Sequence, residues 1–268
     1  MFAFQYRKAK TLKEAGELLA KDDEAKPLSG GMTLIPTLKA RLANPTQLID
    51  INCISELSGI EVKDGALVIG AATKHHQVAT SKVVRDAIPA LAALASSIGD
   101  PQVRNRGTLG GSVANNDPAA DYPSAVLGLN AKIITNKREI AADDFFQGMF
   151  ATALEPGELI VRIAFPLPKK AAYAKFPHPA SGYAMAGVFI AQTAAGVRVA
   201  VTGAGASGVF RWAEAEAALA KNMSAAALEK LTVSADDINE DIHGSREYRA
   251  QLVKVMAGRA AAAIYGKK

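Results

Sequence analysis

Ser29-Gly30-Gly31-Met32-Thr33 and Thr108-Leu109-Gly110-Gly111-Ser112 are the two stretches of this sequence that say most about its fold. Each contains a pair of glycines, and because glycine has no Cβ, the backbone N–H groups can approach a ligand closely. Such groups bind phosphate oxygens without a cationic side chain. Two of these loops converging on one ligand indicate a pyrophosphate, and hence a dinucleotide. For either loop alone, an ordinary tight turn is the commoner explanation.

The first loop lies between elements that favour anion binding. Thr11 and Glu14 have the spacing of a capping box and predict the start of a helix. A short strand is predicted over 26–28 and a further helix over 33–41, so the loop joins a strand to a helix N-terminus. Strand, glycine loop and helix N-terminus in this order form a favourable anion site. Another strand is predicted over 47–51.

The segment between the two loops has a different character. Residues 60–70 predict a hairpin with an Asp64-Gly65 type I′ turn. Helical patterns follow over 74–79 and 87–98, and a polar stretch, 99–107, leads into the second loop. After that loop, the predicted elements are a helix over 121–128 and strands over 131–135 and 158–165.

Residues 166–170 look like a domain boundary. Beyond them, three strands are predicted, of which the last two form a hairpin, and three helices follow. The strands cover 173–176, 184–192 and 197–202; the helices cover 212–220, 224–231 and a last one capped by Ser245, with Tyr248, Leu252, Val255 and Met256 on its inner face. Strands followed by helices are typical of an α+β fold.

Residues 203–208 match the G-x-G-x-x-G pattern of dinucleotide-binding Rossmann folds. That fold also requires a second parallel strand ending in an acidic residue about twenty residues later. The corresponding region, 221–231, is predicted to be helical, and the preceding strand belongs to a hairpin. The pattern is therefore interpreted as a flexible glycine connector.

Composition excludes several classes of protein. The chain has 268 residues, 49% hydrophobic and 21% charged, as expected of a globular protein with one to three domains. It has no apolar run of transmembrane length, and its N-terminus lacks the order of a signal peptide, so a cytoplasmic location is expected. The net charge is +5, but lysines and arginines are scattered, which does not favour nucleic-acid binding.

The single cysteine excludes two further arrangements. Cys53 alone cannot form an internal disulfide or ligate an iron–sulfur cluster, and its apolar surroundings predict a buried, inert thiol. The histidines do not form a metal signature, because His75 and His76 are adjacent while His178 and His243 are isolated. No metal site and no catalytic acid–base residue are predicted.

Three blocks of the sequence resemble the FAD-binding medium subunit of molybdenum hydroxylases, the family of xanthine dehydrogenase, aerobic carbon monoxide dehydrogenase and aldehyde oxidoreductase. These blocks are 28–36, 106–115 and 117–123, and the order of elements extends the resemblance over essentially the whole chain. The resemblance implies an α+β protein. It has a two-part FAD-binding domain of the p-cresol methylhydroxylase/vanillyl-alcohol oxidase type over 1–168, with subdomains of about 1–57 and 58–168. A C-terminal domain, 169–268, packs a small antiparallel sheet on helices.

The resemblance also implies which residues contact a non-covalently bound FAD. The two glycine motifs hold the pyrophosphate, Asp121 is an acidic contact, Ile160 lies near the adenine, and Tyr183 lies against the flavin ring. Ile98 matches a position that is aromatic in the animal xanthine enzymes, and Ser112 replaces a common asparagine. The full set is Ser29, Gly30, Gly31, Met32, Thr33, Ile98, Thr108, Leu109, Gly110, Gly111, Ser112, Asp121, Ile160 and Tyr183.

By the same resemblance, substrate oxidation occurs on other chains. A [2Fe–2S] small subunit and a molybdenum cofactor large subunit are the implied partners, in a dimer of heterotrimers, and the flavin passes electrons to an external acceptor. Two alternatives stay open at this point: a stand-alone FAD-dependent oxidase of the same fold, and a scaffold without flavin. The sequence identifies neither the substrate of the whole enzyme nor its electron acceptor.

Overall fold

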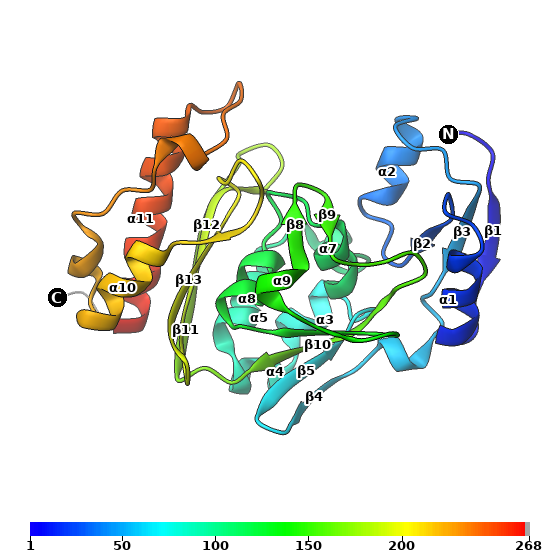
Figure 1. Ribbon diagram of the computed structural model, residues 1–268, viewed down its shortest axis with the longest axis horizontal. Coiled ribbons are helices and arrows are strands. Elements are labelled where there is room, and N and C mark those ends of the chain that lie inside the picture. The colour runs from blue at the N-terminus through cyan, green and yellow to red at the C-terminus, as the bar shows by residue number, and fades with distance from the viewer. Residues whose placement is uncertain (266–268) are drawn as a thin grey trace.

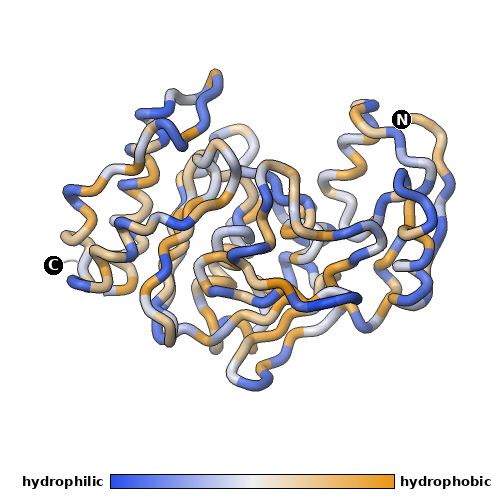
Figure 2. Tube along the Cα trace, in the orientation of Figure 1, coloured by the Kyte–Doolittle hydropathy of each residue, from blue (hydrophilic) through white to orange (hydrophobic). Residues whose placement is uncertain are grey.

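The computed structural model describes residues 1–265, which form three consecutive layers of sheet and helix (Figure 1). The N-terminal elements lie at one end of the molecule, a central sheet with its helices follows, and the last helices lie at the other end. The hydrophobic residues are concentrated along the central strands and helices (Figure 2). No helix within these residues is long and apolar enough to cross a membrane.

The first layer is a parallel sheet of three strands in the order β1-β3-β2. Thr11 caps its first helix, since the Thr11 Oγ1 accepts from the Glu14 N–H, as the capping-box pattern predicted. Leu19, Ile49 and Leu57 belong to a small core beneath the sheet. The elements are β1 Gln5–Lys8, α1 Leu12–Ala20, β2 Lys26–Leu28, α2 Leu34–Lys39, β3 Gln47–Asp50 and a 3₁₀ helix, Ser55–Leu57.

The second layer is an antiparallel sheet of five strands in the order β4-β5-β10-β6-β7. Asp64 and Gly65 both have positive φ, as the predicted type I′ turn of the β4–β5 hairpin requires. The strands are β4 Ile60–Lys63, β5 Ala66–Gly70, β6 Lys132–Thr135, β7 Glu139–Ala141 and β10 Ile160–Pro166, with a separate pair, β8 Phe146–Gly148 and β9 Ala151–Thr152. The helices are α3 His75–Thr80, α4 Lys82–Ala87, α5 Pro89–Ser96, α6 Pro101–Arg104, α7 Leu109–Asn115, α8 Tyr122–Gly128 and α9 Ala142–Phe145.

The third layer is an antiparallel sheet in the order β11-β12-β13-β14, covered on its outer face by helices (Figure 1). Its strands are β11 Lys170–Pro177, β12 Ala184–Thr193, β13 Gly196–Thr202 and β14 Phe210–Arg211. Its helices are α10 Ala213–Lys221, α11 Arg246–Tyr265 and two 3₁₀ helices, Ala225–Leu228 and Ala235–Asp237.

Strand β12 is buried on both faces, which joins the third layer firmly to the second. Phe189 and Ala191 point into the central core, whereas Val188 and Ile190 point into the core beneath α11. Because successive side chains of a strand face opposite sides, one strand contributes to both cores.

Three local predictions were wrong. Cys53 is exposed because it lies in the turn after β3, outside the predicted strand. Ser224 makes no side-chain cap, and only a short 3₁₀ helix follows it. Tyr248 is largely exposed, although Leu252 and Met256 on the same helix are buried as expected.

The G-x-G-x-x-G stretch does not belong to a Rossmann unit. Gly203 follows β13, which pairs antiparallel with both β12 and β14. The interpretation of this stretch as a connector therefore agrees with the sheet topology.

Candidate functional site

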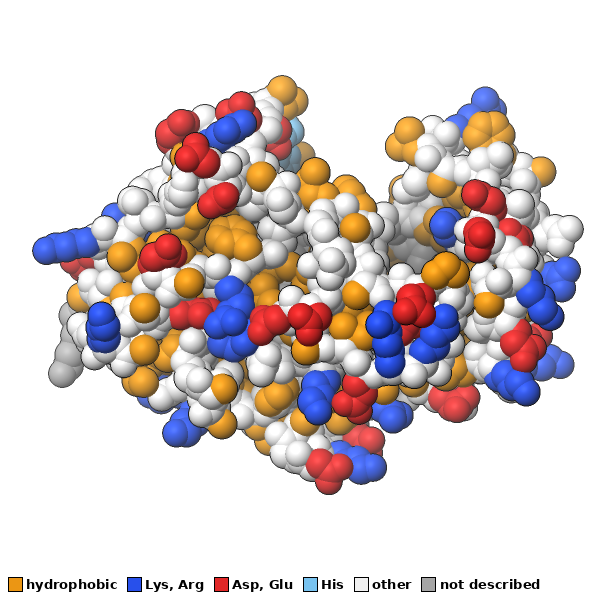
Figure 3. Space-filling model, viewed as in Figure 1, with side chains coloured by type: hydrophobic (Ala, Val, Ile, Leu, Met, Phe, Trp, Pro, Cys, Tyr) orange, Lys and Arg blue, Asp and Glu red, His pale blue; other side chains and the backbone are white. Residues whose placement is uncertain are grey.

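A cavity of about 740 Å³ lies between the N-terminal layer and the central layer. Figure 3 shows the molecule hollowed at this place. The predicted cofactor residues come together here, although they belong to segments far apart in the sequence. Those that line the cavity are Ser29, Gly30, Gly31, Met32, Thr33, Ile98, Thr108, Gly110, Gly111, Ser112, Asp121, Ile160 and Tyr183.

The first glycine motif is a true loop between β2 and α2. Gly31 has φ +72°, which favours glycine over other residues. Within residues 1–265, the backbone N–H groups of residues 30–33 donate to no acceptor of the protein. These residues line the cavity, and binding of a ligand by their N–H groups stays a prediction.

Gly30 is needed for a different reason, because the first loop contacts the segment just before the second motif at this residue. A Cβ at Gly30 would lie 2.3 Å from the Arg106 carbonyl oxygen and 2.7 Å from the Gly107 Cα. Any larger residue would push the segment that precedes the second motif away from the first loop.

The second motif is the start of helix α7, and the prediction of a loop here was wrong. Thr108 is the N-cap, and its Oγ1 accepts from the Gly111 N–H at 3.2 Å. The Leu109 N–H donates to the Thr73 carbonyl oxygen (3.0 Å) and the Gly110 N–H donates to the Ala71 carbonyl oxygen (2.8 Å). The N–H groups of residues 109–112, which the sequence assigned to a ligand, are therefore used within the protein.

Leu109 and Gly110 serve packing. Leu109 is fully buried in the central core and is absent from the cavity lining. A Cβ at Gly110 would lie 2.4 Å from the Ala71 Cβ and 2.8 Å from the Ala71 Cα. The helix can approach the end of β5 this closely only with glycine at this position.

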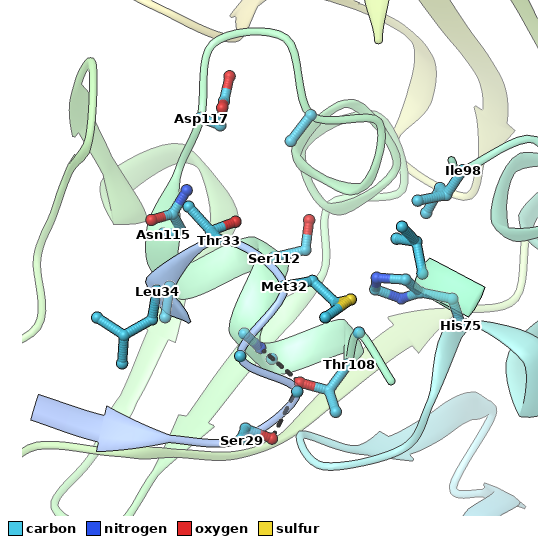
Figure 4. A pocket seen from close by; sticks show the side chains of 18 of the residues that line it. Ser29, Met32, Thr33, Leu34, His75, Ile98, Thr108, Ser112, Asn115 and Asp117 are labelled. Atoms are coloured by element: carbon cyan, nitrogen blue, oxygen red, sulfur yellow. Dashed lines mark hydrogen bonds between the residues drawn. The ribbon is translucent and has the colours of Figure 1, made fainter. Parts of the chain in front are cut away.

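One hydrogen bond joins the two motifs across the cavity floor. The hydroxyl oxygens of Ser29 and Thr108 lie 3.1 Å apart, as the dashed line in Figure 4 shows. The Asn52 side-chain amide donates to the Ser29 carbonyl oxygen at 2.9 Å and so stabilises the same loop. Ser112, one turn into α7, presents its hydroxyl to the cavity (Figure 4).

Asp121 lies at the cavity wall but is almost completely buried. Its carboxylate accepts from the Tyr173 hydroxyl at 2.5 Å and forms an ion pair with the Lys175 ammonium at 3.0 Å. Burial raises the pKa of Asp121, while the Lys175 charge opposes that shift. The carboxylate thus binds the third layer to the cavity wall.

Ile98 and Tyr183 line the same cavity. The Tyr183 side chain is 45% exposed, and its pKa is raised by partial burial and by the negative charges of Asp117 and Asp121. The Lys175 ammonium donates to the carbonyl oxygens of Ser97 (2.8 Å) and Gly182 (3.1 Å), one residue before each of these side chains.

Sequence reasoning missed three residues at this site: His75, Asp117 and Lys175. His75 is buried beside the cavity, with its ring 5.3 Å from that of Tyr122. Burial, with a smaller contribution from the Arg104 charge, lowers the pKa of His75 to about 4. Asp117 lines the cavity in the conspicuous Asp117–Asp121 block, so the sequence did contain a signal for it. No sequence pattern near Lys175 predicted its role, since it contacts the site through Asp121, which is far from it in the sequence.

Within residues 1–265, no group of three or more histidines, cysteines, aspartates or glutamates could hold a metal ion. The residues that line the cavity offer backbone donors, hydroxyl groups and apolar side chains to a ligand.

Comparisons with known proteins agree on one family. Residues 2–168 match the model described as the FAD binding domain in molybdopterin dehydrogenase. The glyceraldehyde dehydrogenase medium chain of Sulfolobus acidocaldarius is 35% identical, with 96% of each chain covered. The carbon monoxide dehydrogenase medium chain of Afipia carboxidovorans is 34% identical over 96% of this chain and 95% of that one.

The solved structures give the same result. A chain of the reconstituted CO dehydrogenase from Oligotropha carboxidovorans superposes with a TM-score of 0.90 at 31% identity, covering 100% of this chain and 99% of that chain. The resemblance found from three sequence blocks is thereby confirmed, and the mixed helix-and-sheet fold is shared along the whole chain.

Proposed function

Because this chain belongs to the FAD-binding family of molybdopterin dehydrogenases, we propose that it is the medium subunit of such an enzyme, with its FAD bound in the cavity described above. Substrate oxidation in complexes of this kind takes place on a partner subunit. The free N–H groups of residues 30–33 are the observation of this structure that carries the proposal, because they offer donors where a pyrophosphate needs them.

Bound FAD would supply the redox chemistry, accepting electrons from partner [2Fe–2S] clusters and passing them to an external acceptor. The chain's own residues bind and orient it. The first loop donates N–H groups, and the hydroxyls of Thr108 and Ser112 can add hydrogen bonds to phosphate oxygens. Ile160 offers an apolar wall near the adenine, and Ile98 and Tyr183 border the flavin end. Asp121 faces the same cavity.

The finer architecture is part of the proposal. We infer a FAD-binding domain of the p-cresol methylhydroxylase/vanillyl-alcohol oxidase type over 1–168, in two parts divided near residue 57, and a C-terminal domain over 169–268. The three larger of the four sheets within residues 1–265, together with three hydrophobic clusters, support this division. A dimer of heterotrimers with a [2Fe–2S] and a molybdenum subunit is the proposed assembly, and the expected cytoplasmic location stays a prediction.

The substrate of the whole enzyme does not follow from this subunit. A glyceraldehyde dehydrogenase chain and a carbon monoxide dehydrogenase chain resemble it almost equally, at 35% and 34% identity. Since two such different substrates accompany nearly equal similarity, substrate choice must be made on another subunit.

Flavin analysis of the purified chain tests the proposal. We expect one FAD per chain, released into the supernatant by acid precipitation, because no cysteine or histidine lies in either glycine motif to form a covalent link. A colourless chain that takes up no added FAD would favour the flavin-free scaffold. Flavin retained in the acid pellet would contradict non-covalent binding.

Partner analysis separates the subunit from a stand-alone oxidase. The chain should co-purify from its source with a protein that contains iron and sulfide and with one that contains molybdenum. The isolated FAD-loaded chain should oxidise neither aldehydes nor carbon monoxide nor purines. Turnover of any of these by the single chain would support the stand-alone oxidase instead.

A further inference from the structure

The loop between β11 and β12 carries Tyr183 and three neighbours, residues 180–182, that line the cavity. His178 begins this loop but is absent from the cavity lining. Its ring Nδ1 accepts hydrogen bonds from two backbone N–H groups, those of Ala180 (3.2 Å) and Ser181 (3.3 Å). One imidazole nitrogen is thus the acceptor for the segment that leads to Tyr183.

The backbone of His178 closes the same loop. Its N–H donates to the Tyr183 carbonyl oxygen at 2.7 Å, and its carbonyl oxygen accepts from the Gly182 N–H at 2.9 Å. The pairing of β11 with β12 shifts register between Phe176 and Pro177, and its last pair is Pro177 with Ala184, immediately beside this loop. The side-chain bonds of His178 therefore add to these two backbone bonds in holding the loop.

The segment before helix α11 contacts the His178 ring through His243. The His243 ring packs edge-on against it, with centroids 4.4 Å apart and planes at 75°. The backbone N–H of His243 donates to the Asp241 Oδ1. The other carboxylate oxygen of Asp241 accepts from the Arg249 guanidinium at 2.7 Å. The His178 ring is thus contacted by a segment outside the loop that is itself held by hydrogen bonds.

We propose that His178 is a positioning residue that sets the place of Tyr183 at the flavin end of the cavity. This inference rests on the proposed FAD site for its functional meaning. An Nδ1 that accepts two N–H groups must carry its lone pair, so the hydrogen-bond pattern assigns the ring proton to Nε2. An asparagine Oδ1 stands at the same distance from Cβ as the histidine Nδ1 and is also an acceptor, whereas alanine offers none.

Hydrogen exchange on the full-length chain tests the loop without depending on flavin. In His178→Ala, exchange of the amides in 180–183 should accelerate by about tenfold or more, because two modest hydrogen bonds are lost. His178→Asn should return exchange close to that of the unmodified chain. Equal exchange in the unmodified chain and in His178→Ala would overturn the proposal, whether or not the chain binds FAD.

The FAD-loaded chain tests the consequence for the flavin. His178→Ala should keep one FAD per chain but shift its visible spectrum and its reduction potential, and His178→Asn should reverse both shifts. In a Tyr183→Ala background, His178→Ala should cause no further shift. A spectrum and a potential that do not change, or a shift that persists in the Tyr183→Ala background, would show that His178 does not act through Tyr183. Failure of the unmodified chain to bind FAD would instead refute the proposed function.

Discussion

Gly31 and Gly110 belong to glycine pairs that look alike in the sequence, yet the chain requires each for a different physical reason. Gly31 lies in a loop with φ +72°, and the N–H groups around it have no acceptor within residues 1–265. Gly110 lies inside helix α7, and its N–H is bonded to Ala71. The first motif leaves its donors free for a ligand, and the second uses its glycine for close packing.

This difference shows that a glycine pair alone does not identify a phosphate site. The first motif can bind a phosphate through its backbone, whereas the second contributes the side-chain hydroxyls of Thr108 and Ser112 and a floor for the cavity. Both motifs line the cavity, but the N–H groups of the glycine pair are without a protein acceptor only in the first motif, within residues 1–265. The following substitutions test that division, in order of their expected effect on the free energy of unfolding.

Gly110→Ala should destabilise the fold by about 3 kcal/mol, because its Cβ would overlap the Ala71 Cβ and backbone. Gly258→Ala in helix α11 is the matched control, since nothing lies within 4 Å of a Cβ there. The control should gain about 0.5–1 kcal/mol from helix propensity. Urea unfolding of both variants measures the difference, and a Gly110→Ala chain as stable as the original would refute the packing role.

The free energy of unfolding should depend on pH through His75, which lies against the segment just before the second motif. The backbone N–H of His75 donates to the Gly107 carbonyl oxygen at 3.0 Å, and the buried imidazole packs against Gly107, where an added Cβ would lie 2.5 Å from the His75 Nε2. Burial lowers the folded pKa to about 4, whereas the unfolded value is about 6.5. The unfolded chain therefore binds the proton first, and stability falls as the pH drops from about 6.5 to 4, by up to about 3 kcal/mol.

His75→Gln should remove this part of the pH dependence. Urea unfolding at several pH values measures the slope within each variant, so a lower overall stability of the variant does not affect the result. An equal slope between pH 6.5 and 4 in both proteins would place the responsible titration at another residue.

The sequence predicted the elements around both motifs because their signals are local. The capping box at Thr11, the Asp64-Gly65 turn and the apolar strands each depend on a few neighbouring residues. The helical state of Gly110 could not be predicted in this way, since it depends on Thr108 acting as an N-cap and on the approach of Ala71. Lys175 was missed because its partners Ser97 and Asp121 are far from it in the sequence, and His178 because its ring contact is with the distant His243 and its other contacts depend on the shape of the loop.

The resemblance to a family added what local signals could not. It brought together residues from 29 to 183, and all of them except Leu109 line one cavity. Leu109 is the exception because a sequence motif is matched as a whole. In the structure the Leu109 side chain is buried in the core, whereas the other residues of the motif line the cavity. Contact with FAD stays a prediction for each of these residues.

Gly31→Val should affect the cofactor far more than the fold. A β-branched residue at φ +72° costs about 2 kcal/mol, and its Cβ would lie 3.0 Å from the Ile35 Cγ1 and 3.2 Å from the Leu28 Cδ1, both side-chain atoms. Gly65→Val is a matched control, because Gly65 has φ +75° in a hairpin turn with nothing within 4 Å of a Cβ. Flavin content should fall sharply in Gly31→Val and stay at one per chain in Gly65→Val.

If both variants kept their flavin, the free N–H groups of the first loop would not be the pyrophosphate donors. If both lost it, backbone strain alone would explain the loss. Thermal unfolding of the two apo proteins provides the check that their backbone penalties are similar.

Thr108→Val should have the smallest effect, about 1 kcal/mol, because it removes the N-cap of α7 while keeping the shape of the side chain. Thr108→Ser should restore most of the loss. Thr108→Val also breaks the hydrogen bond between the hydroxyls of Ser29 and Thr108, which directly links the two motifs. In a double-mutant cycle with Ser29→Ala, the two losses should therefore fall short of additivity by about 0.5 kcal/mol or more. Strict additivity would mean that the bond between the Ser29 and Thr108 hydroxyls does not couple the two motifs energetically.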